Sequence, residues 1–278
     1  MDGEKRQEAD RVQVGDMEVV AVFDGYGYED AREVLLNPGS PEADPWARHE
    51  SQLDEAGRLK FVLGGFLVRT GDRVVLVDAG AGTINNGQYQ GGQLLNSLRE
   101  HGVEPPDITD VIFTHLHFDH VGWATSKGEV VFGNATYRAH EADWAHFVDS
   151  PDAAPGAVRK LSPIKPQLET FAGECALAPG LNARPAPGHT PGSTVFVLSS
   201  GSERALLLGD VVHSPIELLE PGWEFAFDVD RATAKATRQR FTAELADGGD
   251  PAAAAHFPAP QFGRLIRAQA NGPQWIFL

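Results

Sequence analysis

The sequence has little cysteine, a deficit of positive charge and no long apolar run, and each shortage excludes a class of protein. Cys175 is the single cysteine in 278 residues, which rules out the disulfide framework of a small secreted domain. Lys and Arg number 23 against 39 Asp and Glu, a formal net charge of -16, which disfavours nucleic acid and anionic membranes as partners. No apolar stretch approaches the ~20 residues of a membrane helix.

What remains is a composition typical of a globular protein, with 42% hydrophobic and 22% charged residues. The first ten residues are polar and lack an apolar signal core. We therefore expect a flexible N-terminal tail over residues 1–10, a single domain over 11–278 and a cytoplasmic location. The expected partner is a small hydrophobic ester-like substrate, and a homodimer stays open.

Short β-branched and aromatic runs alternate with helical patterns, which predicts an α/β protein built in layers. Strands are expected at 17–23, 61–69, 73–78, 110–114, 136–139, 194–198, 204–208, 264–268 and 275–278, and helices at 93–101, 141–148 and about 230–245. Residues 26–60 and 150–187 have no readable period and are interpreted as long surface excursions, the first a candidate lid.

The most informative segment is His115-Leu116-His117-Phe118-Asp119-His120, which follows an expected strand. Four metal-capable side chains fall within six residues. His115 and His117 point the same way if the backbone stays extended, because side chains alternate along a strand. Imidazole nitrogens and carboxylate oxygens suit zinc, iron, manganese or cobalt. The segment therefore predicts a metal site at the end of a strand.

Three later segments add further metal-capable residues in turns or at a strand end: Gly188-His189-Thr190-Pro191-Gly192, Leu208-Gly209-Asp210 and Ala255-His256-Phe257. Together with the hexapeptide, their types and order resemble the metallo-β-lactamase-fold hydrolases over roughly residues 12 to 270. The resemblance implies a four-layered αβ/βα sandwich with a binuclear metal site at the sheet edge.

Residue by residue, the resemblance implies one ion held by His115, His117 and His189, a second held by Asp119, His120 and His256, and Asp210 bridging them. Zinc is the first expectation for both ions, with manganese, iron or cobalt as alternatives. A metal-bridging hydroxide would be the nucleophile. Asp119 would orient it or accept its proton, and His213 would assist the leaving group.

Within the family, the lactonase and methyl parathion hydrolase branch looks most similar. Residues that suggest it include the segments Gly209-Asp210-Val211-Val212-His213 and Phe227-Asp228-Val229-Asp230. Many acyl-homoserine lactonases carry a tyrosine three residues after the bridging Asp, where this chain has His213. The implied activity is hydrolysis of cyclic or aryl esters, with organophosphate triesters or thioesters as alternatives and a non-catalytic metal-retaining protein as a further one.

Several aromatic residues are candidates for an apolar substrate pocket, since such walls suit small hydrophobic ligands. The candidates are Phe118, Trp123 and Trp223, with Phe225 and Phe227 as further ones, and ordinary core packing is the alternative for each. Asp78, at the end of an expected strand, is interpreted as a support for the site or a structural residue rather than a ligand.

Overall fold

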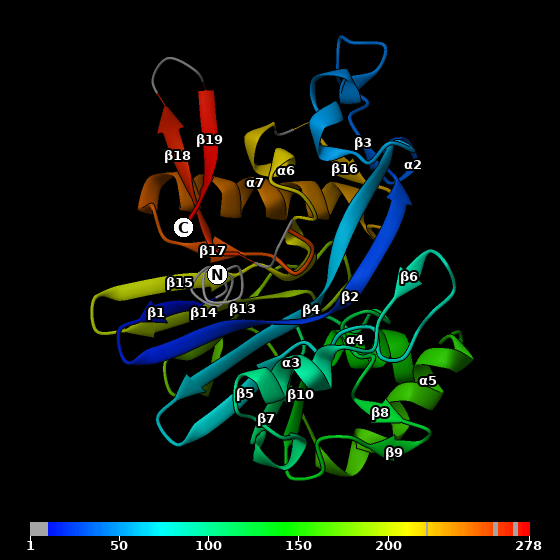
Figure 1. Cartoon of the computed structure of the whole chain (residues 1–278), viewed down its shortest axis with the longest axis vertical. Helices are drawn as coiled ribbons and strands as arrows, with labels where there is room; N and C mark the ends of the chain where they lie inside the picture. Colours follow the sequence, from blue (N-terminus) through cyan, green and yellow to red (C-terminus); the bar gives the residue numbers. More distant parts are fainter. Residues whose placement is uncertain (1–10, 221, 258–260, 269–271) are drawn as a thin grey trace.

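Two β-sheets packed face to face form the centre of the molecule (Figure 1). The computed structural model describes residues 11–220, 222–257, 261–268 and 272–278, so the predicted tail over 1–10 lies outside them. The first sheet contains, in spatial order, β1 (Arg11–Val14), β2 (Met17–Asp30), β4 (Arg58–Thr70), β5 (Arg73–Val77), β7 (Asp110–Ile112), β10 (Thr136–His140) and β11 (Leu168–Phe171), with β6 (Tyr89–Gln90) paired to β2.

The second sheet and two small ribbons complete the strands. The second sheet runs β12 (Cys175–Ala178), β13 (Leu181–Pro185), β14 (Thr194–Ser200), β15 (Glu203–Leu207), β17 (Ala252–Ala253), β18 (Gly263–Ala268) and β19 (Gly272–Phe277). The ribbons pair β3 (Leu35–Leu36) with β16 (Glu224–Phe225), and β8 (Thr125–Ser126) with β9 (Glu129–Val130). The helices are α2 (Ala31–Val34), α3 (Leu94–Glu100), α4 (Glu141–Trp144), α5 (Pro155–Leu161), α6 (Ile216–Leu219) and α7 (Arg231–Gly248).

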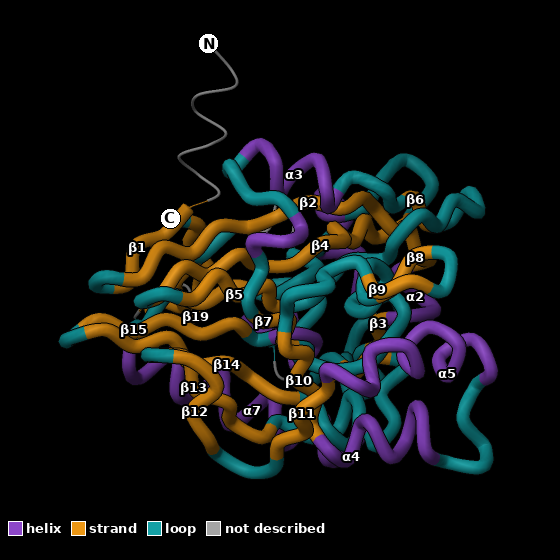
Figure 2. Tube along the Cα trace, turned by 90° about the horizontal axis from the view of Figure 1, so that it is seen from below, coloured by secondary structure: helices purple, strands orange, loops and turns teal. Residues whose placement is uncertain are grey.

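The alternation of side chains along β2 shows how the layers form. Val19 packs into the core between the two sheets, whereas Val20 packs on the opposite face with Leu94 and Leu98 of α3. Figure 2 shows α3, α4 and α5 at the periphery of the strands. On the second sheet, Phe241 and other residues of α7 cover the outer face. The order helices, sheet, sheet, helix confirms the predicted four-layered sandwich.

Helix α7 is the longest helix among the described residues, and its ends follow from local chemistry. Asp230 caps the N-terminus by accepting a hydrogen bond from the backbone N–H of Thr233. Gly249 ends the helix in the left-handed conformation, with φ of 68°. Within the described part of the chain, no helix is long and apolar enough to cross a membrane.

The first predicted excursion, 26–60, is shorter than expected. β2 continues to Asp30 and β4 begins at Arg58, so a twisted two-stranded arm occupies both ends of that range. The residues between them, which include Trp46, form a cap. Its apolar side chains pack together with Trp223 from a much later part of the chain. The arm was missed because its half-buried tyrosines and its charged residues break the apolar alternation on which strand prediction relies.

The second predicted excursion, 150–187, is wrong as a description of a structureless segment. It contains α5 and the strands β11, β12 and β13. β11 forms one edge of the first sheet and β12 forms one edge of the second. These strands of four or five residues are partly exposed, so they lack the apolar pattern of a central strand.

A buried carboxylate joins the first sheet to the loops beside it. Asp24 is fully buried, and its two oxygens accept five hydrogen bonds. The donors are the backbone N–H groups of Ala81, Gly82, Gly92 and Leu94 and the indole N–H of Trp123. Each of these donors would be unsatisfied without the carboxylate, because backbone N–H groups in the interior have no water to bind.

We therefore expect Asp24→Asn to lower the free energy of unfolding by at least about 2 kcal/mol, because an amide N–H₂ would face donors in place of one oxygen. Urea unfolding measures the change. Asp30→Asn is the matched control, since Asp30 lies exposed at the end of the same strand and Asn caps a helix as well as Asp. Equal stability of the two variants would contradict this role of Asp24.

Candidate binuclear metal centre

All seven predicted ligands converge at one edge of the sandwich, on loops that follow strands. They fall into two groups, and the candidate ligand atoms within each group lie within 4.8 Å of one another. The first group is His115, His117, His189 and Asp210, and the second is Asp119, His120 and His256. The two sets of three agree with the grouping that the resemblance implies, while Asp210, expected between them, falls here with the first set. The assignment of the residues as ligands stays a prediction.

Asp210 lies between the two groups and contacts both. Its Oδ2 is 3.6 Å from His115 Nε2, 3.4 Å from His189 Nε2 and 3.2 Å from His256 Nε2. Its Oδ1 is 3.4 Å from His120 Nε2. Asp210 thus contacts histidines of both groups, through Oδ2 to each group and through Oδ1 to the second, which is where a bridging carboxylate would lie.

Three of the imidazoles are held from behind by the nitrogen that faces away from the centre. His120 Nδ1 is 2.9 Å from Asp78 Oδ2, His189 Nδ1 is 3.0 Å from Asp228 Oδ1, and His256 Nδ1 is 2.8 Å from the carbonyl oxygen of Val62. Such partners fix the ring orientation and select the nitrogen that faces a metal.

His117 is the exception among the histidines. Its Nδ1, rather than its Nε2, lies 3.0 Å from His115 Nε2 and 2.9 Å from His189 Nε2. Three ring nitrogens that converge this closely are a donor set suited to a cation. Donor type and geometry therefore fit a divalent ion in this group.

Orphaned atoms give an independent test of the fit. His120 Nε2 and Asp210 Oδ1 are buried and have no hydrogen-bond partner among the described residues, although they lie 3.4 Å apart. A buried polar atom without a partner costs free energy, so such atoms call for an explanation. A divalent ion beside them would satisfy both.

Two glycines allow the ligand loops to approach their neighbours. Gly209, directly before Asp210, has φ of +53°, and a Cβ there would lie 2.8 Å from Thr114 Cβ. Gly188, directly before His189, has φ of +134°, and a Cβ there would lie 2.2 Å from the backbone nitrogen of Ala234 in α7. Both positions require the left-handed region that other residues rarely adopt.

Two buried aspartates support these loops. Asp78 has φ of 61°, a strained value for a residue with a side chain, and its Oδ1 accepts the N–H of Thr114 at the start of the hexapeptide loop. Asp143 accepts the N–H of Leu116 through Oδ2 and the N–H of Gly192 through Oδ1. Asp143 thus joins the loop that carries His115 to the loop that carries His189.

Burial and neighbouring charge separate the protonation states within the centre. Burial holds the pKa of His115 well below its ordinary value and lowers that of His117 to about 3, which leaves both rings neutral, as metal binding requires. Burial opposes charge on His120 as well, but Asp210 and nearby carboxylates outweigh it and raise its pKa. Burial also disfavours ionised Asp210, yet His256 and the other imidazoles hold its pKa well below the ordinary value.

His213 lies at the rim of the same centre. Its Nε2 is 3.5 Å from Asp210 Oδ2 and its Nδ1 is 3.5 Å from Glu217 Oε2. The ring stacks on Phe225 with the centroids 3.5 Å apart. Burial disfavours the charged ring, but Asp210 and Glu217 outweigh burial and raise the pKa of His213 to about 9.

The three predicted pocket aromatics have different surroundings. Phe118 is 48% exposed beside the ligands and packs edge-on against Tyr89. Trp123 is buried in the core of the first sheet with its indole N–H on Asp24, and Trp223 is buried against Trp46. These two tryptophans are core residues here, so only Phe118 is kept as a proposed pocket residue. Of the two further candidates, Phe227 is 57% exposed, whereas Phe225 is buried and stacked on His213.

Sequence reasoning missed most of the supporting shell. Asp143 and Glu217 lie in segments with no motif, and Arg238 is one of several charged residues along α7. Their burial alone distinguishes them from surface charges: Asp143 and Glu217 are each 1% exposed and Arg238 is 3% exposed. Asp228 belongs to the Phe227–Asp230 segment already noted, but its contact with His189 had no signal in the sequence.

Comparison with known proteins agrees with this geometry. An N-acyl homoserine lactonase from Bacillus sp is 29% identical over 163 residues, which are 51% of this chain and 60% of the relative, so the chain spans about three fifths of the relative's length. The solved structure of AidC, a dizinc quorum-quenching lactonase in complex with a homoserine product, is 28% identical and covers 96% of both chains with a TM-score of 0.85. The hydrolase AbOPH of the beta-lactamase superfamily is 25% identical, with a TM-score of 0.83 over 96% of both chains.

The family model of the metallo-beta-lactamase superfamily matches residues 65–256, which include all seven candidate ligands. With the layered fold and the two histidine groups joined by Asp210, this match shows that the chain belongs to the metallo-β-lactamase superfamily of metal-dependent hydrolases.

Proposed function

We propose that the protein is a binuclear metal-dependent lactonase and esterase. The observation that carries the proposal is the position of Asp210, whose carboxylate faces histidines of both groups. When bound, two divalent ions would lower the pKa of a water molecule and polarise the ester carbonyl. Zinc is the first candidate because the similar AidC is a dizinc enzyme, and manganese, iron and cobalt suit the same ligands.

The side chains of the chain itself would divide the remaining work. Asp119 is the least buried of the candidate ligands in its group, and its Oδ2 lies 3.5 Å from His256 Nε2. A carboxylate in this position can orient a water molecule and accept its proton. His213, held between Asp210 and Glu217, can give a proton to the departing oxygen.

Apolar groups at the rim favour a small hydrophobic substrate. Phe118 and Phe227 are both large and exposed, and Phe225 joins Phe227 to the ring of His213. An acyl chain or an aromatic leaving group would lose water on contact with such rings, which favours binding. The lactonase relatives make acyl homoserine lactones the first substrates to test.

Aryl esters and phosphotriesters are the second candidates. His213 stands where many acyl-homoserine lactonases have tyrosine, and its ring stacks flat on Phe225, which places an aromatic side chain beside the centre. Thioesters, which would use the same ligands, are a third class to test.

A substrate panel tests the proposal directly. Purified protein loaded with zinc should open N-hexanoyl homoserine lactone with a higher kcat/KM than it shows for a phosphotriester or a glutathione thioester, with an aryl ester in between. A phosphotriester turned over fastest would favour the second candidate. No turnover of any of the four would overturn the proposed function and leave a metal-retaining binding protein.

Asp210→Asn keeps the size of the side chain and removes its charge. We expect loss of at least one metal ion per chain and at least about 100-fold lower kcat. The reason is that an amide offers one uncharged oxygen where the carboxylate offers two between the two ligand groups. Elemental analysis after dialysis measures the metal. Asp72→Asn, in the exposed turn after β4, is the control and should keep both. Full metal content in Asp210→Asn would contradict a bridging role.

His213→Gln should lower kcat by roughly 10²-fold for a lactone, whose alkoxide leaving group needs a proton, and by much less for a p-nitrophenyl ester, whose phenolate does not. Metal content should stay unchanged, which is checked on the same samples. An equal loss for both substrates would show that His213 does not protonate the leaving group.

A further inference from the structure

A single guanidinium group lies directly behind the candidate metal centre. Arg238, on α7, is 3% exposed and is the only buried Lys or Arg among the residues that the structure describes. Its Nε donates to the carbonyl oxygen of Val211 at 2.9 Å and lies 3.1 Å from Glu217 Oε1. Its Nη1 donates to the carbonyl oxygen of Trp223 at 2.9 Å, and its Nη2 lies 3.4 Å from Asp228 Oδ2.

Three of these contacts each connect Arg238 to a different residue of the centre. Val211 directly follows Asp210, so the bond to its carbonyl fixes the backbone beside the proposed bridge. The other oxygen of Asp228 lies 3.0 Å from His189 Nδ1. The other oxygen of Glu217 accepts the backbone N–H of His213 and faces the His213 ring.

The burial of these groups makes the guanidinium hard to replace. Glu217 is 1% exposed and Asp228 is 7% exposed, and burying a carboxylate without a cation costs several kcal/mol. The planar fork of Arg presents N–H groups in several fixed directions at once, which the ammonium of Lys cannot do. Removal of Arg238 would therefore leave two buried carboxylates free to turn away from His189 and His213.

We propose that Arg238 is a positioning residue of the metal centre, which holds Asp210, His189 and His213 in their relative places through Val211, Asp228 and Glu217. The residue touches neither a proposed ligand side chain nor the substrate region. Its influence on the ion of the first group goes through His189, and its influence on the leaving group goes through His213. The activity part of this inference rests on the proposed function, and the metal part does not.

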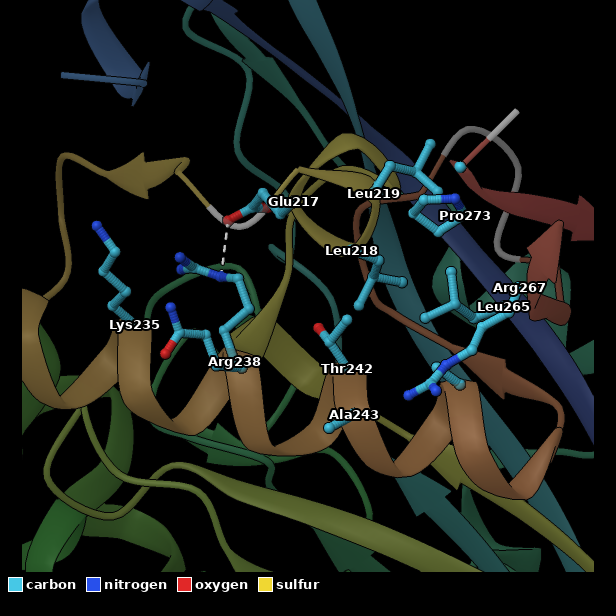
Figure 3. A pocket seen from close by; sticks show the side chains of 13 residues that line it. Glu217, Leu218, Leu219, Lys235, Arg238, Thr242, Ala243, Leu265, Arg267 and Pro273 are labelled. Atoms are coloured by element: carbon cyan, nitrogen blue, oxygen red, sulfur yellow. Dashed lines mark ion pairs between the residues drawn. The ribbon is translucent and has the colours of Figure 1, made fainter. Parts of the chain in front are cut away.

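The outer side of this network faces a cavity of about 440 Å³ between α6, α7 and the β18–β19 hairpin (Figure 3). Glu217 and Arg238 form part of its wall, together with apolar residues such as Leu218 and Leu265. Lys235 also lines the cavity, but its Nζ is 2.9 Å from Glu224 and it is therefore already paired. Because Arg238 lines this cavity, a shorter side chain at position 238 would fit without clashing with its neighbours.

The cavity also supplies a matched control. Thr242 lies one helical turn after Arg238, lines the same cavity, and its buried hydroxyl has no hydrogen-bond partner among the described residues. Thr242→Val keeps the shape and removes only that hydroxyl. It should leave metal affinity and activity at the wild-type level and should not lower stability.

The test compares Arg238→Met and Arg238→Lys with Thr242→Val. Zinc affinity is measured for each ion by competition with a chromophoric chelator, and folding is checked by urea unfolding. We expect Arg238→Met to bind the ion of the His115, His117 and His189 group about 10- to 100-fold more weakly, while the other ion keeps its affinity within a few fold. Arg238→Lys should recover part of the loss, because it restores the charge but not the fork.

Two further variants separate the branches and carry the test if Arg238→Met does not fold. Asp228→Asn should weaken binding of the same zinc ion and leave the ratio of kcat for the lactone to kcat for the p-nitrophenyl ester unchanged. Glu217→Gln should keep both zinc ions and lower that ratio, as loss of His213 would. A folded Arg238→Met with wild-type affinity for both ions would overturn the inference. The inference would also fail if Asp228→Asn and Glu217→Gln both kept the wild-type zinc affinities and the wild-type ratio of kcat for the two substrates.

These readouts keep the two proposals apart. Zinc affinities are measured without substrate, so a wild-type protein that binds two ions and turns over nothing would overturn the proposed function and leave the positioning role of Arg238 intact. Conversely, the protein could be a lactonase in which substitution of Arg238, Asp228 and Glu217 changes neither the zinc affinities nor the ratio of kcat for the two substrates. That result would support the proposed function and overturn the inference.

Discussion

The contact on which the rest of the site depends is that of the Asp210 carboxylate with the imidazoles around it. An ionised carboxylate in the interior is costly unless cations or several donors face it. Here the nearest groups are ring nitrogens: burial keeps His115 neutral, whereas Asp210 and other carboxylates outweigh burial and raise the pKa of His120 and His213. Metal ligation needs neutral imidazoles, so a bound cation would take the place of the proton that His120 carries beside Asp210.

The sequence was sufficient to select the candidate ligands because most of their chemistry is local. Four of them lie within the hexapeptide. His189 and Asp210 each follow a glycine that has a positive φ value and closely packed neighbours. The supporting residues are a different case. Asp143 and Arg238 act across distances of tens of residues in the chain, and nothing near either residue distinguishes it from a solvated charge. Their function follows from burial, which the sequence alone does not reveal.

The fold was predicted where strands are central and missed where they lie at an edge or extend beyond the core. The hairpins at 61–78 and 194–208 are continuous apolar runs because both of their faces are covered. β11 to β13 are partly exposed, and the arm formed by β2 and β4 carries charged residues over its tyrosines, as Lys60 does on Tyr26. Trp123 and Trp223 failed as pocket residues for a related reason, since a large aromatic residue near a ligand motif can equally fill the core.

The distribution of buried charge explains why the centre needs ions at this point. Eight acidic residues are buried in the described part of the chain, against Arg238 as the one buried Lys or Arg: Asp24, Glu29, Asp78, Asp110, Asp143, Asp210, Glu217 and Asp228. N–H and hydroxyl groups satisfy Asp24 and Asp143, arginines pair with Asp110, and Arg238 pairs with Glu217 and Asp228. Asp78 and Asp210 pair with no Lys or Arg and meet at His120, whose pKa their carboxylates raise. Metal ligation requires neutral rings, so divalent ions would supply at this place the positive charge that a proton on His120 otherwise provides.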